Sequence, residues 1–476
     1  MISQIMIFLI LVSCREDIAQ SPRGYDITVK IKNFKDTVAY LGYNFGDQKF
    51  VKDTSKVING NTLRFVNDTT RLPQGIYFVY SPSVYFEFIV NEPKFTLETD
   101  TADFVGDMKV EGSKENRIFN EFQKYMAARQ SESTKLAGQV DTLQKQNDTA
   151  AVSAIRKKLT AISDEVKDYQ KKLIKNNKGM FVAKLVEGMQ KPEVPDPPKA
   201  DSGSVARNWQ FFYYKKHFFD HFDIADSGLL RSPIYQPKID EYTDKLTYQD
   251  PDSIEAAVDF LLSKAERNKE TYRYLLVKLT NKYETSNIMG MERVFVYLAE
   301  KYYLTGKAFW ADTSLTNKFE KRVKELKPNL VGNVAPDMQL VDTLMHPVRL
   351  SNLHNRFTIL YFYDPDCGHC KKTTPVLYDL YQKSLKAKGV AVWAACIVTD
   401  VKKWKAFIRN DHLNGWINVA DPNLHDNFRA EYDIKSTPTI YILNSKREII
   451  AKRLGVDQID DFIDKMIEFE NNKNKT

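Results

Sequence analysis

The chain has 476 residues, of which 43% are hydrophobic and 28% are charged. A typical domain has about 150 residues, so the length predicts several domains, and the composition excludes disorder as the main state. The formal net charge is +7 without a long basic run, so we expect no nucleic-acid partner. Four cysteines in a chain of this length exclude a disulfide-stapled scaffold, and cysteine chemistry is expected to be local.

The N-terminal residues 1–20 read as a targeting segment. The apolar run from Ile5 to Val12 is too short to span a bilayer but has the length of a signal-peptide core. The tetrapeptide ending at Cys14, LVSC, resembles a bacterial lipobox, which implies that Cys14 is lipidated and anchors the protein to a membrane. Simple secretion with cleavage near Ala19 is the alternative. Both predict an exported protein of the cell envelope, periplasmic or membrane-anchored.

Residues 24–112 have the pattern of a β domain. Apolar residues alternate at period two, and Gly, Asn, Asp and Pro separate the runs VAYLGY, LRFV, IYFVY, VYFEFIV and KFTLET. This pattern predicts a compact antiparallel, β-sandwich-like domain. The segment contains no Cys, His or Gly-rich phosphate loop, so its chemistry does not indicate a role.

Residues 113–328 have helical patterns. A heptad-like seam is formed by Ile155, Leu159, Ile162, Val166, Tyr169 and Leu173, and a weaker one by Leu136, Val140 and Leu143. The polar stretch 147–149 separates the two seams, which predicts a helical hairpin packed on its own domain; an intermolecular coiled coil is the alternative. The four prolines of residues 191–204 predict a loop, after which helical patterns resume.

Two histidines in this region have the spacing of a metal site. His217 and His221 stand one helical turn apart and could present two imidazoles to a metal ion. No HExxH motif and no convincing third ligand accompany them. We therefore expect an aromatic packing surface there, and no metal site in the chain.

Residues 331–472 change to a βαβ-like pattern. FTILYFY and VAVWAACIV are continuous apolar runs suited to central strands, TIYIL and EIIAKRL read as a hairpin, and a final helix is expected from about Gln458 to Glu470. The predicted fold is therefore multidomain: an antiparallel β domain, an α-helical domain, and an α/β domain with a mixed sheet.

The motif Cys367-Gly368-His369-Cys370 follows the FTILYFY strand and leads into a helix. A helix N-terminus stabilises a thiolate, so Cys367 is the expected nucleophile and Cys370 the resolving thiol of a redox-active disulfide. Structural zinc needs four ligands, and haem attachment needs His at position 371, which is Lys. We expect no other cofactor; a structural disulfide is the alternative, and Cys396 is expected to be a buried thiol.

A second motif lies in the segment KSTPT, residues 435–439. The order strand, CxxC, helix, strand, helix, then Thr-Pro leading into a hairpin resembles the thioredoxin fold. The resemblance implies that Pro438 is cis and lies against the active-site disulfide, and that the backbone of Thr437 pairs with a substrate peptide.

The residues at the start of this domain make the resemblance more specific. Gly332, the tripeptide Ala335-Pro336-Asp337, Leu340, Asp342 and the run VRLS resemble the start of envelope thiol–disulfide oxidoreductases of the TlpA and ResA type. The resemblance covers roughly residues 331–472. The upstream regions are similar to domains of unknown function that precede redoxin domains in envelope proteins of some Gram-negative bacteria.

Several residues depart from the thioredoxin pattern. Asp366 stands where thioredoxins have Trp, and Tyr361 where they have a buried Asp. The Gly-His dipeptide resembles that of protein disulfide isomerase, so His369 is expected to stabilise the Cys367 thiolate. Asp366, expected at the substrate-binding surface, would oppose it by repulsion. Asp400 is a candidate acid near the sulfurs.

We therefore expect an enzyme of the thiol–disulfide oxidoreductase class. Its partners would be protein thiols and disulfides and an unidentified redox partner, in a role in cell redox homeostasis. A peroxiredoxin-like thiol peroxidase is an alternative, but Pro365 lies only two residues before Cys367, which does not fit the P-x-x-x-[ST]-x-x-C pattern. A non-catalytic envelope binding or scaffold protein is the other alternative.

Overall fold

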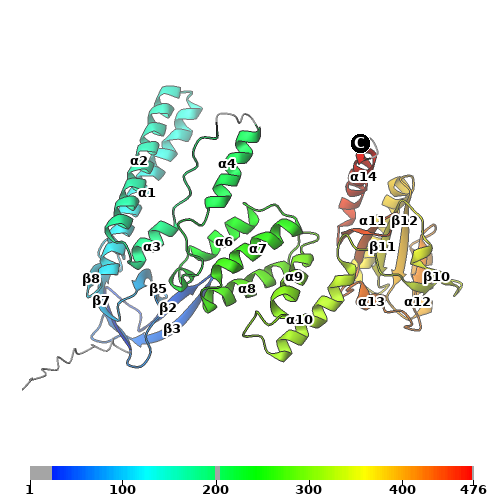
Figure 1. Cartoon of the computed structure of the whole chain (residues 1–476), viewed down its shortest axis with the longest axis horizontal. Coiled ribbons are helices and arrows are strands. Elements are labelled where there is room, and N and C mark those ends of the chain that lie inside the picture. Colours follow the sequence, from blue (N-terminus) through cyan, green and yellow to red (C-terminus); the bar gives the residue numbers. More distant parts are fainter. Residues whose placement is uncertain (1–23, 199–203, 474–476) are drawn as a thin grey trace, which may run out of the picture. The chain divides into compact units, whose positions relative to one another are not determined.

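The computed structural model describes residues 24–198 and 204–473, which form two compact units (Figure 1). One unit contains the described chain up to Leu246 together with Lys264–Thr271. The other contains Thr247–Ser263 and the described chain from Tyr272 onward. The order of an antiparallel β region, a helical region and an α/β region confirms the predicted multidomain fold class. The predicted targeting segment, with Cys14, lies outside the described residues.

The first unit begins with two β-sheets. Among the described residues their strand orders are β4-β1-β7-β8 and β3-β2-β5-β6. The strands are β1 (Tyr25–Lys32), β2 (Val38–Phe45), β3 (Gln48–Lys56), β4 (Thr62–Asn67), β5 (Gly75–Ser81), β6 (Val84–Val90), β7 (Lys94–Asp100) and β8 (Lys109–Glu111). Alternating residues such as Ile27, Val29, Leu41 and Phe65 are fully buried in a shared core, as the period-two pattern predicts. All strand pairs are antiparallel except β1 with β7, which is parallel and was not predicted.

The helical region of the first unit starts with the predicted hairpin. Helix α1 (Lys114–Lys145) runs into α2 (Thr149–Asn176) through a tight turn in which Asn147 has φ 56°, and Asp148 caps α2 by accepting from Ala151 N at 2.9 Å. The next helices are α3 (Phe181–Gly188), α4 (Ser204–His217), α5 (Ser227–Leu230), α6 (Tyr235–Asp244), α7 (Pro251–Ala265) and α8 (Lys269–Glu284), the last two contributing to both units.

The second unit joins helices to a mixed sheet. Helices α9 (Glu292–Leu298) and α10 (Thr313–Leu326) precede a sheet of order β10-β9-β13-β12-β11-β14-β15 within the described chain. Its strands are β9 (Gln339–Val341), β10 (Pro347–Arg349), β11 (Phe357–Tyr363), β12 (Val390–Cys396), β13 (Ile417–Ala420), β14 (Thr439–Asn444) and β15 (Ile449–Lys452). Its helices are α11 (Gly368–Leu380), α12 (Val401–Asn410), α13 (Phe428–Glu431) and α14 (Val456–Lys473).

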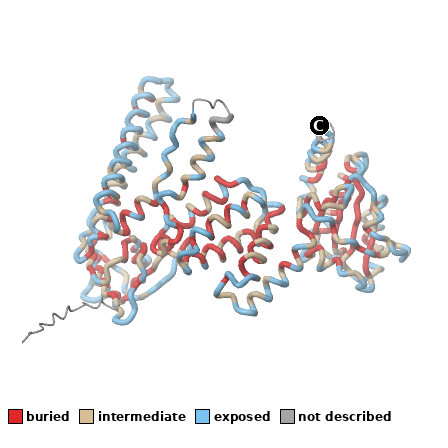
Figure 2. The backbone as a smooth tube through the Cα atoms, viewed as in Figure 1, coloured by how far each residue is buried: buried red, intermediate tan, exposed pale blue. Residues whose placement is uncertain are grey.

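Strand β11 lies in the interior of this sheet, between β12 and β14, and positions the CxxC motif. It pairs in parallel with β12 and antiparallel with β14, and all seven of its residues are buried (Figure 2). Phe357, Ile359, Tyr361 and Tyr363 face a core that includes residues of α11, α12 and α14, whereas Leu360 and Phe362 face the core on the other side. Burial on both faces explains why this strand has a continuous apolar sequence.

The described residues contain no helix that is both long enough and apolar enough to cross a bilayer.

Candidate active site

The loop after β11 places Cys367 at the start of a helix. The Asp364 carboxylate accepts a hydrogen bond from Asp366 N at 2.7 Å, and the Asp364 carbonyl accepts one from Cys367 N at 3.1 Å. These bonds turn the chain so that α11 begins at Gly368, with Cys367 as its N-cap residue. The free backbone N–H groups of the first helical turn therefore face the Cys367 sulfur, as predicted.

The two cysteines of the motif differ in environment. Cys367 is half-buried and Cys370 is fully buried, and both are thiols. The backbone N–H of Cys370 contributes most to lowering the pKa of Cys367, followed by the Thr437 side chain, while burial acts in the opposite direction. Burial raises the pKa of Cys370 to about 11. The outer thiol is thus the one that forms a thiolate more readily, while the roles of nucleophile and resolving thiol stay predictions.

The segment that precedes β14 lies against the motif. The Thr437–Pro438 peptide bond is cis, as the thioredoxin resemblance implies. The Cys367 thiol donates a hydrogen bond to the Thr437 carbonyl at 3.3 Å, although the two residues are 70 positions apart. The Thr439 hydroxyl donates to the Ser436 carbonyl at 2.6 Å. The pairing of β11 with β14 therefore brings the two sequence motifs together, because one follows β11 and the other precedes β14.

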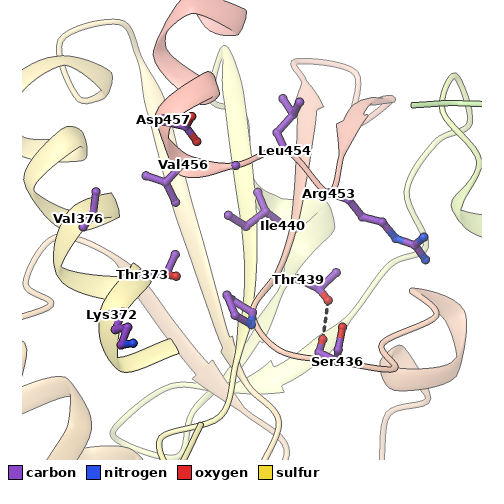
Figure 3. Close-up of a pocket in the computed structure, with 12 residues that line it drawn as sticks. Lys372, Thr373, Val376, Ser436, Thr439, Ile440, Arg453, Leu454, Val456 and Asp457 are labelled. Carbon is purple, nitrogen blue, oxygen red and sulfur yellow. Dashed lines mark hydrogen bonds between the residues drawn. The ribbon is translucent and has the colours of Figure 1, made fainter. Parts of the chain in front are cut away.

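A groove of about 530 Å³ lies beside Pro438 (Figure 3). Its walls come from the outer face of α11 and from the segment that links β15 to α14. The lining residues are Lys372, Thr373, Val376, Ser436, Pro438, Thr439, Ile440, Arg453, Leu454, Gly455, Val456 and Asp457. Val376 is 57% exposed although it is apolar, and with Ile440, Leu454 and Val456 it gives the groove an apolar lining.

The three polar residues expected near the sulfurs, Asp366, His369 and Asp400, make different contacts. The Asp366 carboxylate accepts a hydrogen bond from Lys403 Nζ at 2.7 Å, which lowers the pKa of Asp366 and pairs its charge. His369 is exposed, and its backbone N–H helps to lower the pKa of Cys367. Asp400 caps α12 by accepting from Lys402 N and Lys403 N, both at 3.0 Å. Its carboxylate is therefore engaged by backbone groups of its own helix.

A buried hydroxyl pair at the base of the motif was not predicted. The Tyr361 and Thr374 hydroxyl groups are 2.7 Å apart, and neither side chain is exposed. Burial raises the pKa of Tyr361 well above its usual range, so the pair stays neutral. Tyr361 is where the resemblance places a buried Asp, and Thr374 lies one helical turn after Cys370. That helical spacing is the signal by which the pair could have been found.

The remaining cysteine and the two histidines lie in different environments. Cys396 is a fully buried thiol in β12, which confirms that prediction. Within residues 24–198 and 204–473, no cluster of three or more His, Cys, Asp or Glu side chains could hold a metal ion. His217 is the last residue of α4, so His221 does not share its helix as the spacing had suggested. His217 instead pairs with Asp220 at 2.6 Å and packs on the ring of Tyr213.

Comparisons with known families divide the chain in three. Residues 25–119 and 170–326 match two families described as domains of unknown function, DUF4369 and DUF5106. Residues 331–452 match the AhpC/TSA family.

Known relatives are similar to the last of these segments. The thiol-disulfide oxidoreductase ResA of Bacillus subtilis is 27% identical over 127 residues, which are 26% of this chain and 67% of the relative. A solved domain of a possible thiol-disulfide isomerase from Cytophaga hutchinsonii is 39% identical, with 31% of this chain and 99% of that chain covered and a TM-score of 0.29. A solved thioredoxin-like protein from Bacteroides caccae is 19% identical, with 58% and 98% covered and a TM-score of 0.45. Through residues 331–452 the chain is similar to the AhpC/TSA family and to the thiol–disulfide oxidoreductase ResA, which indicates an oxidoreductase enzyme.

Proposed function

We propose that this enzyme exchanges disulfides with protein substrates through the CGHC dithiol of Cys367 and Cys370. The observation that carries the proposal is the asymmetry of the two thiols. Cys367 is accessible at the N-terminus of α11, with a lowered pKa, whereas Cys370 is buried one turn further along with a raised pKa. A nucleophile with a protected resolving thiol is the arrangement that disulfide exchange requires.

The reaction takes place in two thiol exchanges. The Cys367 thiolate attacks one sulfur of a substrate disulfide, which forms a mixed disulfide and releases the other substrate sulfur as a thiolate that takes up a proton. Cys370 then loses its proton and attacks the Cys367 sulfur. A Cys367–Cys370 disulfide forms, and the second substrate sulfur leaves as a thiol. The substrate has gained two electrons and two protons, and the reverse sequence oxidises a substrate dithiol.

The groove beside Pro438 is the proposed substrate site. The apolar lining suits a peptide side chain next to the reacting cysteine, and the backbone of Thr437 would pair with the peptide as a short strand. The Asp366–Lys403 pair lies at the rim of the motif and would meet the substrate surface. A separate redox partner would return the dithiol to its starting state, and the Cys367–Cys370 disulfide would be the only redox group needed.

We also propose that the protein acts in the cell envelope, outside the cytoplasm. The apolar run Ile5–Val12 and the lipobox-like LVSC support export and lipidation of Cys14. The test is fractionation of cells that express the full chain and its Cys14→Ala variant. Wild-type protein in the membrane fraction and variant in the soluble fraction would support lipidation, and equal distribution would contradict it.

Insulin reduction by dithiothreitol tests the proposed activity. The wild-type protein is expected to accelerate precipitation of the insulin B chain, and Cys367→Ser is expected to abolish the acceleration. Cys396→Ala is a matched control, because Cys396 is a buried thiol outside the motif. A wild-type rate equal to the uncatalysed rate, and equal to that of Cys367→Ser, would refute the proposal.

A further inference from the structure

Helix α10 contacts the segment that leads to Thr437 and Pro438. Arg322 on α10 donates two hydrogen bonds to the Asp433 carboxylate, at 2.7 Å and 3.1 Å. The Asp433 side chain is only 1% exposed, and that of Arg322 is 19% exposed. A bidentate pair this deeply buried fixes both partners in place. Arg322 lies outside residues 331–452, the segment that matches the redox family.

Asp433 in turn organises the residues around the groove. Its carboxylate also pairs with Lys435 and with Arg453, each at 3.3 Å. Arg453 lines the groove, and Lys435 is two residues before Thr437. The backbone at Asp433 has φ 46°, a left-handed conformation that Asp adopts more readily than most residues do. The ion pairs therefore act on the side chain of a residue at which the chain turns.

A second contact ties α9 to the wall of the groove that contains Arg453. Lys452, at the end of β15, is 4% exposed and pairs with Glu292 of α9 at 2.6 Å. Its ammonium group also donates to the Asn329 side chain at 2.9 Å and to the Asn329 carbonyl at 3.1 Å. The groove-lining segment begins at the next residue, Arg453. The Asn329 amide further donates to the Glu431 carbonyl at 2.8 Å, close to Asp433.

We propose that helices α9 and α10 hold the walls of the substrate groove in place, with Arg322 as a positioning residue that holds the Thr437–Pro438 loop through Asp433. The inference rests on the proposed function and deepens it. Loss of the Arg322 guanidinium leaves the buried Asp433 carboxylate with two ion-pair partners among the described residues, Lys435 and Arg453, whose side chains are 60% and 56% exposed. The loop then samples other positions, and a peptide that pairs with its backbone binds less well. A small disulfide that does not use the groove is unaffected.

The test compares Arg322→Gln and Arg322→Lys with a control on the same helix. Lys324→Gln removes an exposed pair with Glu320, at 2.8 Å, in which both partners belong to α10. Insulin and the small disulfide 5,5′-dithiobis(2-nitrobenzoate) are the two substrates, and circular dichroism checks folding. Arg322→Gln is expected to raise KM for insulin at least tenfold while the rate with the small disulfide stays within twofold. The KM of Arg322→Lys for insulin should lie between those of Arg322→Gln and the wild type, because the lysine keeps the charge but loses the second hydrogen bond.

Hydrogen exchange provides a readout that does not depend on turnover. Amides of residues 433–440 should exchange at least tenfold faster in Arg322→Gln than in the wild type, while those of β11 should not change. If Arg322→Gln does not fold, the same measurements on Arg322→Lys decide. Unchanged exchange in this loop, or an equal loss of rate with both substrates, overturns the inference. If the wild type has no activity on insulin the proposed function fails, and exchange alone then decides whether Arg322 holds the loop.

Discussion

At neutral pH the two thiols of the CGHC motif are expected to differ at least a hundredfold in their rate of alkylation. With its pKa at about 11, Cys370 is a thiolate in roughly one molecule in ten thousand at pH 7. An ordinary cysteine thiol, with a pKa near ~8.5, would be ionised in roughly 3% of molecules. The lowered pKa of Cys367 raises its thiolate fraction further. Full burial of Cys370 adds to the difference, because the reagent must reach the sulfur.

The assay is alkylation of the reduced protein with iodoacetamide, followed by mass mapping of the peptides. Cys370 is best followed in the Cys367→Ser variant, where the two titrations are no longer coupled. Its rate should rise about tenfold per pH unit up to about pH 11, since the first cause of its raised pKa is burial and not the neighbouring thiol. Cys367 in a Cys370→Ser variant should reach its plateau below the pH of an ordinary thiol. Both should react equally in urea. Faster modification of Cys370 than of Cys367 in the folded protein would refute the reasoning.

Three further predictions concern other contacts. Tyr361→Phe should destabilise the protein by about 1–3 kcal/mol in urea unfolding, because it leaves the buried Thr374 hydroxyl unpaired, and adding Thr374→Val should recover part of the loss; additive losses would contradict this. Glu115→Ala should cost about 2–3 kcal/mol without changing insulin reduction, because the Glu115 carboxylate accepts from two buried backbone N–H groups at the start of α3; unchanged stability would contradict it. Lys403→Met should leave the Asp366 carboxylate unpaired, and the pH profile of Cys367 alkylation should move to higher pH in low salt only. A shift to lower pH, or a shift that persists in 1 M salt, would contradict this electrostatic effect.

The sequence predicted those elements correctly whose burial gives a clear apolar pattern. Strand β11 has seven buried residues and reads as a central strand, and the CxxC directly after it fixes the strand-to-helix junction. The strand β3 was missed because most of its residues are exposed and it carries almost no apolar alternation. The strands β9 and β13 were missed because they are only three and four residues long.

Contacts between distant positions had no signature in the sequence. Arg322 and Asp433 are 111 residues apart, and each alone reads as an ordinary surface charge. The pairing of Asp366 with Lys403, and of Tyr361 with Thr374, likewise depends on how β11, α11 and α12 pack. The thioredoxin resemblance predicted the cis peptide at Pro438. It gave no information on the contacts that α9 and α10 make with this domain, because both helices lie outside the matched segment.

The central claim is that Cys367 and Cys370 exchange electrons reversibly with other thiols. It is tested most directly by equilibrating the protein in dithiothreitol or glutathione redox buffers, quenching with an alkylating agent, and counting free thiols by mass spectrometry. We expect a single two-electron transition with a midpoint between about −270 and −120 mV, the range of exchanging dithiols. A midpoint below about −300 mV, typical of structural disulfides, or no bond between the two cysteines in oxidising buffer, would contradict it.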